Sequence, residues 1–243
     1  MTLLHDYQHA TAYSRAAMPM RDPHWQKSVG LYKSYAETGA PVVSLKRPDT
    51  WPKADLWEAL RARRSHRHFA GAPMPQPTLM LLLWAAQGIT QPGHWPFRTA
   101  PSAGALYPVE TYVCAARVEG LEPGVYHWEL PAERLALVAA RDDVAAAAQA
   151  ACLDQGMVGR APVSFLWSAI WGRGAQKYGD RALRYVYLDA GHLAQNLHLA
   201  ATALGLGACM IGAFLDDEMN ALVGADGEEE SVVYAACVGI PRG

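Results

Sequence analysis

The strongest pattern in the chain is a run of regularly spaced apolar residues between about Asp180 and Leu206. Six of them step by four and three residues, the spacing that places side chains on one face of a helix: Val186, Ala190, Leu193, Leu197, Ala200 and Leu204. Four more apolar residues lie off that face, namely Leu188, Ala194, Leu199 and Ala203. We therefore expect a long helix that is buried nearly all round, either at the centre of the protein or in a dimer interface.

Shorter patterns predict further elements on both sides of this helix. Capped or amphipathic stretches indicate helices over Asp55 to Ala62, Pro77 to Gly88, Asp142 to Leu153 (with Asp142 as its cap) and Asp216 to Val223. Runs of β-branched and aromatic residues indicate strands over Val109 to Val118, Gly124 to Trp128, Leu135 to Ala139, Pro162 to Ile170, Ala208 to Ile211 and Val232 to Val238. Because helices and strands alternate irregularly, the pattern favours an α+β fold over a doubly wound parallel sheet.

Residues 1–53 differ from the rest of the chain in composition and in hydrophobic periodicity. They hold five prolines, at positions 19, 23, 41, 48 and 52, and show little periodicity. Tyr32, Tyr35 and the pair Val42-Val43 nevertheless provide apolar anchors. We predict an extended arm with one short helix, packed on a main domain that spans residues 54–243.

Composition narrows the classes of function. The net charge is −2 and the pI about 6.5, so the chain lacks the basic footprint of a protein that binds nucleic acid or an anionic membrane. Its four cysteines form no C-x-x-C pair, which disfavours a metal cluster or a disulfide framework. No apolar run reaches the roughly 20 residues of a membrane span, and the N-terminus lacks the features of a signal peptide. We expect a cytoplasmic protein with reduced thiols.

The most informative chemistry lies in the segment Arg63-Arg64-Ser65-His66-Arg67, directly after the first predicted helix of the main domain. Arginine presents a planar fork of donors that fits phosphate oxygens, and a serine hydroxyl adds another donor. If the segment is extended, Arg63, Ser65 and Arg67 point to one side and Arg64 to the other. The alternative is a solvated basic helix end, where cations suit the helix dipole.

Three more segments carry candidate chemistry. Small residues lie between two prolines at Pro101-Ser102-Ala103-Gly104-Ala105-Leu106-Tyr107-Pro108, where a simple turn is the alternative. The pair Lys177-Tyr178 comes just before the long helix. Gly205, Gly207 and Gly212 follow that helix and do not satisfy G-x-G-x-x-G, so a dinucleotide-binding fold is a poor interpretation. A helix stop at Gly205 explains the first of them.

These four segments, in this order, resemble the flavin-dependent nitroreductase superfamily, and within it the SagB-type branch, over about residues 55–240. The resemblance implies an α+β nitroreductase-like fold with a mostly antiparallel central sheet wrapped by helices. It also implies a homodimer that binds FMN in shared sites. The matching residues would hold the flavin phosphate and ribityl chain (Arg63, Arg64, Ser65, Arg67), contact FMN, often from the partner subunit (Pro101, Ser102, Ala103), and lie beside its ring (Ile211, Gly212, Asn196).

A phosphate ligand from the far C-terminus, seen in many superfamily members, cannot be placed in this sequence. Arg242 is only a weak substitute. This departure leaves the phosphate shell incomplete at the level of sequence.

In the SagB-type branch, a Lys-Tyr pair at the position of Lys177 and Tyr178 is essential for the oxidation of azoline rings in peptides to azoles. Both residue types have ordinary pKa values near 10, so a base near neutrality needs an environment that shifts them. A surface lysine beside a packing tyrosine is the alternative. The resemblance thus predicts an FMN-dependent azoline dehydrogenase, with a cyclodehydratase and a precursor peptide as partners and oxygen as the oxidant.

Two rival functions share this fold. One is an NAD(P)H-dependent nitro- or quinone reductase, and the other is a flavin-binding scaffold subunit without turnover. A polar strip on the long helix (Tyr185, Asp189, His192 and Asn196) must also find partners. A single histidine and a single aspartate make a thin metal site, so we predict no metal and expect hydrogen bonds at a dimer interface instead.

Overall fold

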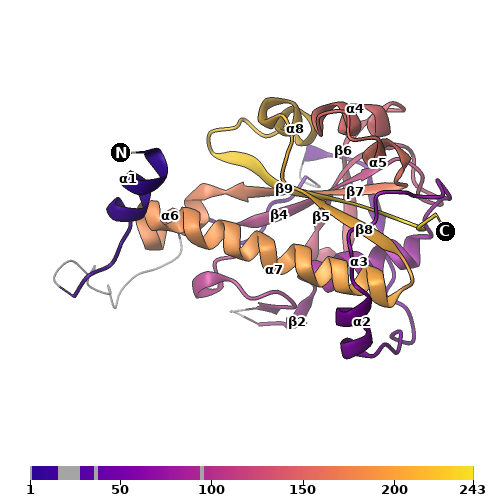
Figure 1. Cartoon of the computed structure of the whole chain (residues 1–243), viewed down its shortest axis with the longest axis horizontal. Helices are drawn as coiled ribbons and strands as arrows, with labels where there is room; N and C mark the ends of the chain where they lie inside the picture. Colours follow the sequence, from indigo (N-terminus) through magenta and orange to yellow (C-terminus); the bar gives the residue numbers. More distant parts are fainter. Residues whose placement is uncertain (1, 16–27, 36–37, 94–95, 243) are drawn as a thin grey trace.

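A seven-stranded antiparallel sheet organises the protein, with the strand order β1-β6-β5-β4-β7-β9-β8 (Figure 1). The computed structural model describes residues 2–15, 28–35, 38–93 and 96–242. The strands of the sheet are β1 (Val42–Ser44), β4 (Val109–Ala115), β5 (Gly124–Glu129), β6 (Arg134–Ala140), β7 (Val163–Ile170), β8 (Gly207–Ile211) and β9 (Glu230–Gly239). The predicted antiparallel α+β architecture is confirmed, and strand β4 ends three residues before the predicted Val118.

Two layers of helices cover the two faces of the sheet (Figure 1). Side chains that alternate along β7 separate the layers: Phe165 and Trp167 pack in the core beneath α3 (Gln76–Gln87) and α7 (Ala182–Ala203). Leu166, between them, packs in the second core beneath α4 (Val144–Ala151), α5 (Gly156–Arg160) and α8 (Asp216–Val223). Each large apolar side chain buried in this way contributes roughly 1.5–3 kcal/mol. The helix α2 (Leu56–Ala62) lies against α7, and its cap is Asp55, which accepts hydrogen bonds from the backbone N–H groups of Trp57 (2.7 Å) and Glu58 (3.1 Å).

The long helix is α7, and it differs from the prediction at its ends and on its surface. The helix α6 (Trp171–Tyr178) and a 3-10 turn, η4 (Gly179–Arg181), precede it without a break, and Gly205, at φ +72°, follows its last turn. Tyr187 and Leu188 are 54% and 58% exposed in the single chain, so one subunit does not bury the helix on all sides, and burial of this face in a dimer interface stays a prediction. The sheet and α3 cover only the inner faces of α7.

The cap of α4 is a second correction. The helix begins after Asp143, not Asp142, and Asp143 makes no side-chain cap hydrogen bond. Arg141 explains this difference, because its guanidinium takes both carboxylate oxygens of Asp143 at 2.7 and 2.9 Å. The carboxylate is therefore not available to the backbone N–H groups of the helix.

Short elements join these layers: β2 (Ile89–Gln91), β3 (Phe97–Arg98), η2 (Ala103–Ala105) and η3 (Leu130–Ala132). None was predicted. They leave the segment between α3 and β4 free of long helices and strands, and this segment carries much of the candidate site.

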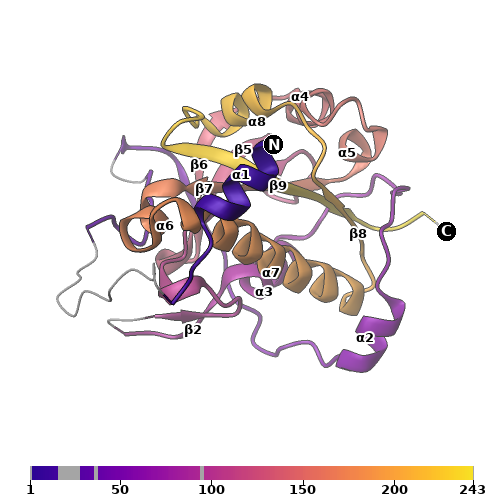
Figure 2. The same cartoon turned by 60° about the vertical axis from the view of Figure 1, so that its left-hand side comes forward.

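Within residues 1–53, the short predicted helix is α1 (Leu3–Ala10), which lies beside α6 and the beginning of α7 (Figure 2). Another part of this arm, β1, pairs with β6 and so becomes an edge of the main sheet. The division into an arm and a main domain at residue 53 stays a prediction. In the described part of the chain, every helix is too short or too polar to cross a membrane.

Candidate active site

Lys177 and Tyr178, at the end of α6, reach the same point as Gly104. A Cβ placed on Gly104 would lie 2.6 Å from the hydroxyl oxygen of Tyr178 and 2.9 Å from Nζ of Lys177. Gly104 has a φ of +63°, which also favours glycine. Folding thus brings together two segments that the sequence had presented separately, and a side chain at position 104 would have to displace the ends of Lys177 and Tyr178.

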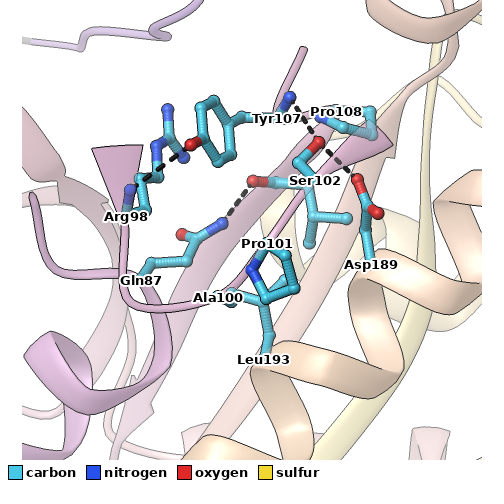
Figure 3. A pocket seen from close by; sticks show the side chains of 10 residues that line it. Gln87, Arg98, Ala100, Pro101, Ser102, Tyr107, Pro108, Asp189 and Leu193 are labelled. Atoms are coloured by element: carbon cyan, nitrogen blue, oxygen red, sulfur yellow. Dashed lines mark hydrogen bonds between the residues drawn. The ribbon is translucent and has the colours of Figure 1, made fainter. Parts of the chain in front are cut away.

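The segment around Gly104 holds an unusual backbone. Besides Gly104, both Ala105 (φ +52°) and Tyr107 (φ +46°) adopt left-handed conformations that cost non-glycine residues of order 1–3 kcal/mol each. Ser102 fixes the segment: its hydroxyl donates to Asp189 Oδ2 at 2.5 Å and accepts the backbone N–H of Tyr107 at 2.9 Å (Figure 3). The candidate site is therefore held rigidly on this side.

Asp189 provides the anchor on α7. It is 4% exposed, and its Oδ1 also accepts the backbone N–H of Ala103 at 3.4 Å. Burial raises the pKa of Asp189, while the hydrogen bond from Ser102 opposes that rise. A cavity of about 10 Å³, roughly the space of one water molecule, lies beside Pro101, Ser102 and Asp189 (Figure 3). This cavity is therefore too small for anything larger than a water molecule.

The predicted polar strip on α7 is satisfied largely within the chain. Asp189 bonds to Ser102, Asn196 Nδ2 donates to the carbonyl of Thr99 at 3.2 Å, and the Tyr185 hydroxyl accepts from Arg181 Nε at 2.8 Å. The expectation that these three bond across a dimer interface is therefore corrected, because neighbouring segments of the same subunit face them. Among the described residues, no group of three or more His, Cys, Asp or Glu side chains is arranged to hold a metal ion.

The basic segment follows α2 and contacts the strand β8. Ser65 pairs with Ala208 in a parallel bridge, and the N–H of His66 donates to the carbonyl of Ala208 at 2.9 Å. Ala208 belongs to β8, which leads directly to Ile211 and Gly212. The basic segment and the Ile211-Gly212 segment therefore start from the same strand pairing.

Ile211 and Gly212 differ in what they present. Ile211 is 3% exposed and its side chain packs in the core beneath α4 and α8, so the side chain is not available to a ligand. Gly212 is exposed, and a Cβ placed on it would meet nothing closer than the Tyr234 ring at 3.9 Å. The backbone at Gly212 is therefore accessible from the surface.

Arg242 lies closer to the basic segment than the sequence indicated. Phe69 pairs with Pro241, and the N–H of Arg242 donates to the carbonyl of His68 at 2.9 Å. The last described residues thus run antiparallel to residues 68–70. This pairing was missed because an isolated Pro-Arg after a strand carries no signal of its partner.

The donor set at this place fits an anion such as a phosphate. Arg67 is exposed and Arg63 partly exposed, and among the described residues neither they nor Arg242 form an ion pair with a carboxylate. The Arg64 side chain instead turns back, with Nε donating to the carbonyl of Ala62 at 3.0 Å. Burial lowers the pKa of nearby His198, and the charges of Arg63 and His66 lower it further, which indicates a positive potential.

The two halves of the candidate site lie on opposite sides of α7. Asp189 and Asn196 hold the segment from Thr99 to Ala103, whereas His198 Nε2 lies 3.1 Å from the carbonyl of Arg64 in the basic segment. At about 100° per residue, positions 189 and 196 share one face of the helix, and position 198 lies on the opposite face. Nine residues also separate 189 from 198 by roughly 13 Å along the axis. Within one subunit the two halves therefore contact α7 on different faces.

Comparisons with known proteins agree with this architecture. A family model described as "Nitroreductase family" matches residues 60–240. A nitroreductase candidate of Methanocaldococcus jannaschii, MJ1384, is 40% identical over 183 residues, which cover 75% of this chain and 90% of that protein. The trifolitoxin-processing protein TfxB of Rhizobium leguminosarum bv. trifolii is 32% identical over 113 residues, covering 45% of this chain and 30% of that protein.

Two solved structures extend the comparison. A nitroreductase candidate from Anabaena variabilis has a TM-score of 0.78 and 27% identity, over 99% of this chain and 47% of its own, so our chain spans about half its length. A chain of the E. coli microcin synthetase McbBCD complex has a TM-score of 0.65 and 19% identity, over 100% of this chain and 83% of its own. At that identity the second match shows the fold alone.

Proposed function

Because this chain belongs to the nitroreductase family, we propose that it is an FMN-dependent oxidoreductase that oxidises a thiazoline or oxazoline ring in a peptide to the azole. One observation carries the proposal: Nζ of Lys177 and the hydroxyl of Tyr178 converge on Gly104, next to the segment expected to contact the flavin. The oxidation removes two hydrogens from the ring. A base is needed for one of them, and two candidate bases stand at this point.

In this proposal the chain's own residues bind, orient and deprotonate. Arg63, Ser65 and Arg67, with Arg242 beside them, would hold the flavin phosphate by charge-assisted hydrogen bonds. Arg64 would contribute through its backbone, since its side chain turns toward Ala62. Pro101, Ser102, Ala103, Asn196 and the backbone of Ile211 and Gly212 would line the flavin ring.

The chemistry divides between cofactor and protein. When bound, FMN supplies the two-electron redox step, accepting one ring hydrogen as a hydride, and oxygen would finally take those electrons and leave as hydrogen peroxide. Lys177 or Tyr178 would accept the other hydrogen as a proton. Gly104 keeps the space between these side chains and the substrate free.

We also propose a homodimer in which each site combines the Lys177 half of one subunit with the Arg63 half of the other. The opposite placement of the halves on α7 supports this, as do the exposed Tyr187 and Leu188 on its outer surface. A mixed-dimer experiment tests it. Lys177→Ala protomers and Arg63→Ala/Ser65→Ala protomers, each inactive alone, should regain about a quarter of the sites after random reassociation. Sites that are complete within one subunit would regain none.

The name of TfxB, a trifolitoxin-processing protein, supports a peptide substrate. The proposed partners are therefore a precursor peptide and the cyclodehydratase that forms its azoline rings. Copurification of the chain with such a cyclodehydratase, followed by mass spectrometry of the precursor peptide, tests whether these are its partners.

A second candidate is an NAD(P)H-dependent nitro- or quinone reductase. The 40% identity to MJ1384, whose name describes a nitroreductase, favours it. The third possibility, a flavin-binding scaffold without turnover, would leave every activity unchanged in a Lys177→Ala protein.

One pair of assays separates these functions. The FMN-reconstituted protein is first mixed with NAD(P)H without oxygen, and the flavin absorbance is followed. It is then mixed with a peptide that carries one thiazoline ring in air, and the peptide mass is measured. Loss of two hydrogens with a slow nicotinamide reaction supports the dehydrogenase. Rapid bleaching with an unchanged peptide would replace it with the reductase.

A further inference from the structure

The N-terminal arm contacts the chain on both sides of Lys177 and Tyr178. Just before the pair, Oε1 of Gln176 accepts the backbone N–H groups of Ser28 at 2.8 Å and Val29 at 3.2 Å. Beyond it, Arg184 Nε donates to the Thr11 hydroxyl at 2.8 Å, and Arg181 donates to the carbonyl of Thr11. The helix end that carries the pair is therefore held between two parts of the arm.

Arg173 is the centre of the first contact. It lies on α6, four residues before Lys177, and is 1% exposed. Its Nε donates to the carbonyl of Gly30 in the arm at 2.7 Å, and its Nη1 donates to the carbonyl of Tyr107 at 3.1 Å. The same Nη1 lies 2.5 Å from Glu110 Oε1 on β4. One guanidinium thus joins α6, the arm, the sheet and the segment that contains Gly104.

Glu110 gives Arg173 a fixed, charged partner. Its Oε2 lies 2.8 Å from Nε2 of His127, which is fully buried on β5. Burial alone would raise the pKa of Glu110, but the hydrogen bond to His127 and the charge of Arg173 lower it to about 2. The carboxylate is therefore ionised at neutral pH and gives the Arg173 guanidinium a charged partner.

Arg173 connects to both sides of the contact at Gly104. On one side, it lies on α6 one helical turn before Lys177, so the bonds that hold Arg173 also hold the turn from which Lys177 projects. On the other side, Tyr107 is the third left-handed residue of the strained segment, three residues beyond Gly104. We propose that Arg173 is a positioning residue for the Lys177–Tyr178 pair, with the arm at Ser28–Gly30 as its second support. The proposal rests on the proposed function for its kinetic consequence but not for its structural one.

The test uses Arg173→Lys and Gln176→Ala in the full chain. A lysine keeps the charge opposite Glu110 but cannot donate to Gly30 and Tyr107 together, because it lacks the fork of a guanidinium. Arg134→Lys is the matched control. Arg134 also forms an ion pair with a buried glutamate that contacts the arm, Glu129, which accepts the N–H of Tyr35 at 2.6 Å.

Two readouts are needed. A fluorinated tyrosine placed at position 178 reports the surroundings of that ring by fluorine NMR, without flavin or substrate. The kcat, KM and pH profile of ring oxidation report the reaction. For Arg173→Lys we expect a shifted fluorine signal, a displaced pH profile and a kcat at least about tenfold lower, because a misplacement of roughly 1 Å can cost on the order of a hundredfold. The KM should change little, and Gln176→Ala should show the same changes in smaller measure.

Arg134→Lys should keep the fluorine signal and the pH profile of the unmodified chain. If Arg173→Lys and Gln176→Ala also keep both, the positioning role is wrong. Should Arg173→Lys fail to fold, Gln176→Ala alone decides by the same criterion. A shifted fluorine signal in Arg173→Lys, together with full ring oxidation by both Lys177→Ala and Tyr178→Phe, would instead refute the proposed function and leave the positioning role standing.

Discussion

At the N-terminal end of α7, Ser102 and Asp189 are hydrogen-bonded to each other, and Lys177 and Tyr178 meet close by at Gly104. At its C-terminal end, buried His198 contacts the basic segment at Arg64, and no described carboxylate pairs with the accessible Arg63 and Arg67. At the first end the side chains hold one another by hydrogen bonds within the protein. At the second end the arginine side chains have no carboxylate partner among the described residues.

This difference suits the first end to positioning catalytic groups and the second end to binding an anion. Groups that must act on a reacting atom gain from a geometry fixed during folding, because no reorganisation is then needed at the moment of reaction. Exposed guanidinium groups remain hydrated until an anion replaces the water. The catalytic end should therefore respond to substitutions through rate, and the basic end through affinity.

The largest expected effect is on the rate at the catalytic end. Lys177→Ala should lower kcat for ring oxidation by about 10²–10⁴-fold, because a positioned base contributes that much. Tyr178→Phe, measured beside it, shows which of the two side chains is the base. Flavin content, measured from the absorbance of the purified protein, should stay unchanged. A loss of flavin with the rate would show that the two ends are not separate in function.

The next effect is on stability at the same end. Glu110 has a pKa of about 2, below its ordinary value of 4.5, so its contribution is present above about pH 4.5 and is lost as the pH falls toward 2. Glu110→Gln should therefore lower the free energy of unfolding by about 3 kcal/mol at neutral pH, with the gap closing in acid. Urea denaturation at a series of pH values measures this. Asp143→Asn, at an exposed pair with Arg141, should change the pH dependence far less.

A smaller effect is expected on flavin affinity at the basic end. Arg63→Ala should weaken FMN binding by about 10–100-fold, since a hydrogen bond to a charged group contributes roughly 1.5–3 kcal/mol. Fluorescence titration of the flavin-free protein provides the affinity. Arg61→Ala is the control, because Arg61 pairs with Glu58 on α2 and lies outside the basic segment. Equal losses of FMN affinity in both variants would show that the arginines act only through general electrostatic attraction and not through a specific phosphate contact.

The smallest effect concerns His198. Its folded pKa is lowered, so the neutral ring stabilises the fold above about pH 6.5, and this stability is lost as the pH falls toward the folded pKa. His198→Gln should flatten the pH dependence of unfolding below about pH 6.5. Bound FMN should flatten it in the unmodified protein as well, because its phosphate would offset the charge of Arg63. A slope that FMN leaves unchanged would place the phosphate elsewhere.

The sequence predicted the elements whose stability comes from apolar periodicity. The core of α7 and the strands β4, β7 and β9 follow from runs of apolar residues whose burial dominates their free energy. The helix α6 was missed, since Gly172 and Gly174 weaken its helical signal and its anchor is Arg173, whose partners lie on β4 and in the arm. The strand β1 was missed because only three residues form it.

The same reasoning explains what could be predicted of the candidate site. The basic segment was recognisable because three arginines and a serine adjoin in sequence. The meeting of Lys177 with Gly104 was not, because no local pattern encodes a contact between residues more than seventy positions apart. Asp189 was seen as part of a polar strip, but its partner Ser102 depended on the tertiary fold.

Because of Gly104, the site can be damaged by adding a side chain as well as by removing one. A methyl group is the smallest side chain that a substitution can introduce, and at Gly104 it would occupy the place where the two polar atoms meet. A Gly104→Ala protein would retain every functional group of the site and yet force those groups apart. For this family member, a complete inventory of reactive residues is therefore not a sufficient criterion for an active enzyme.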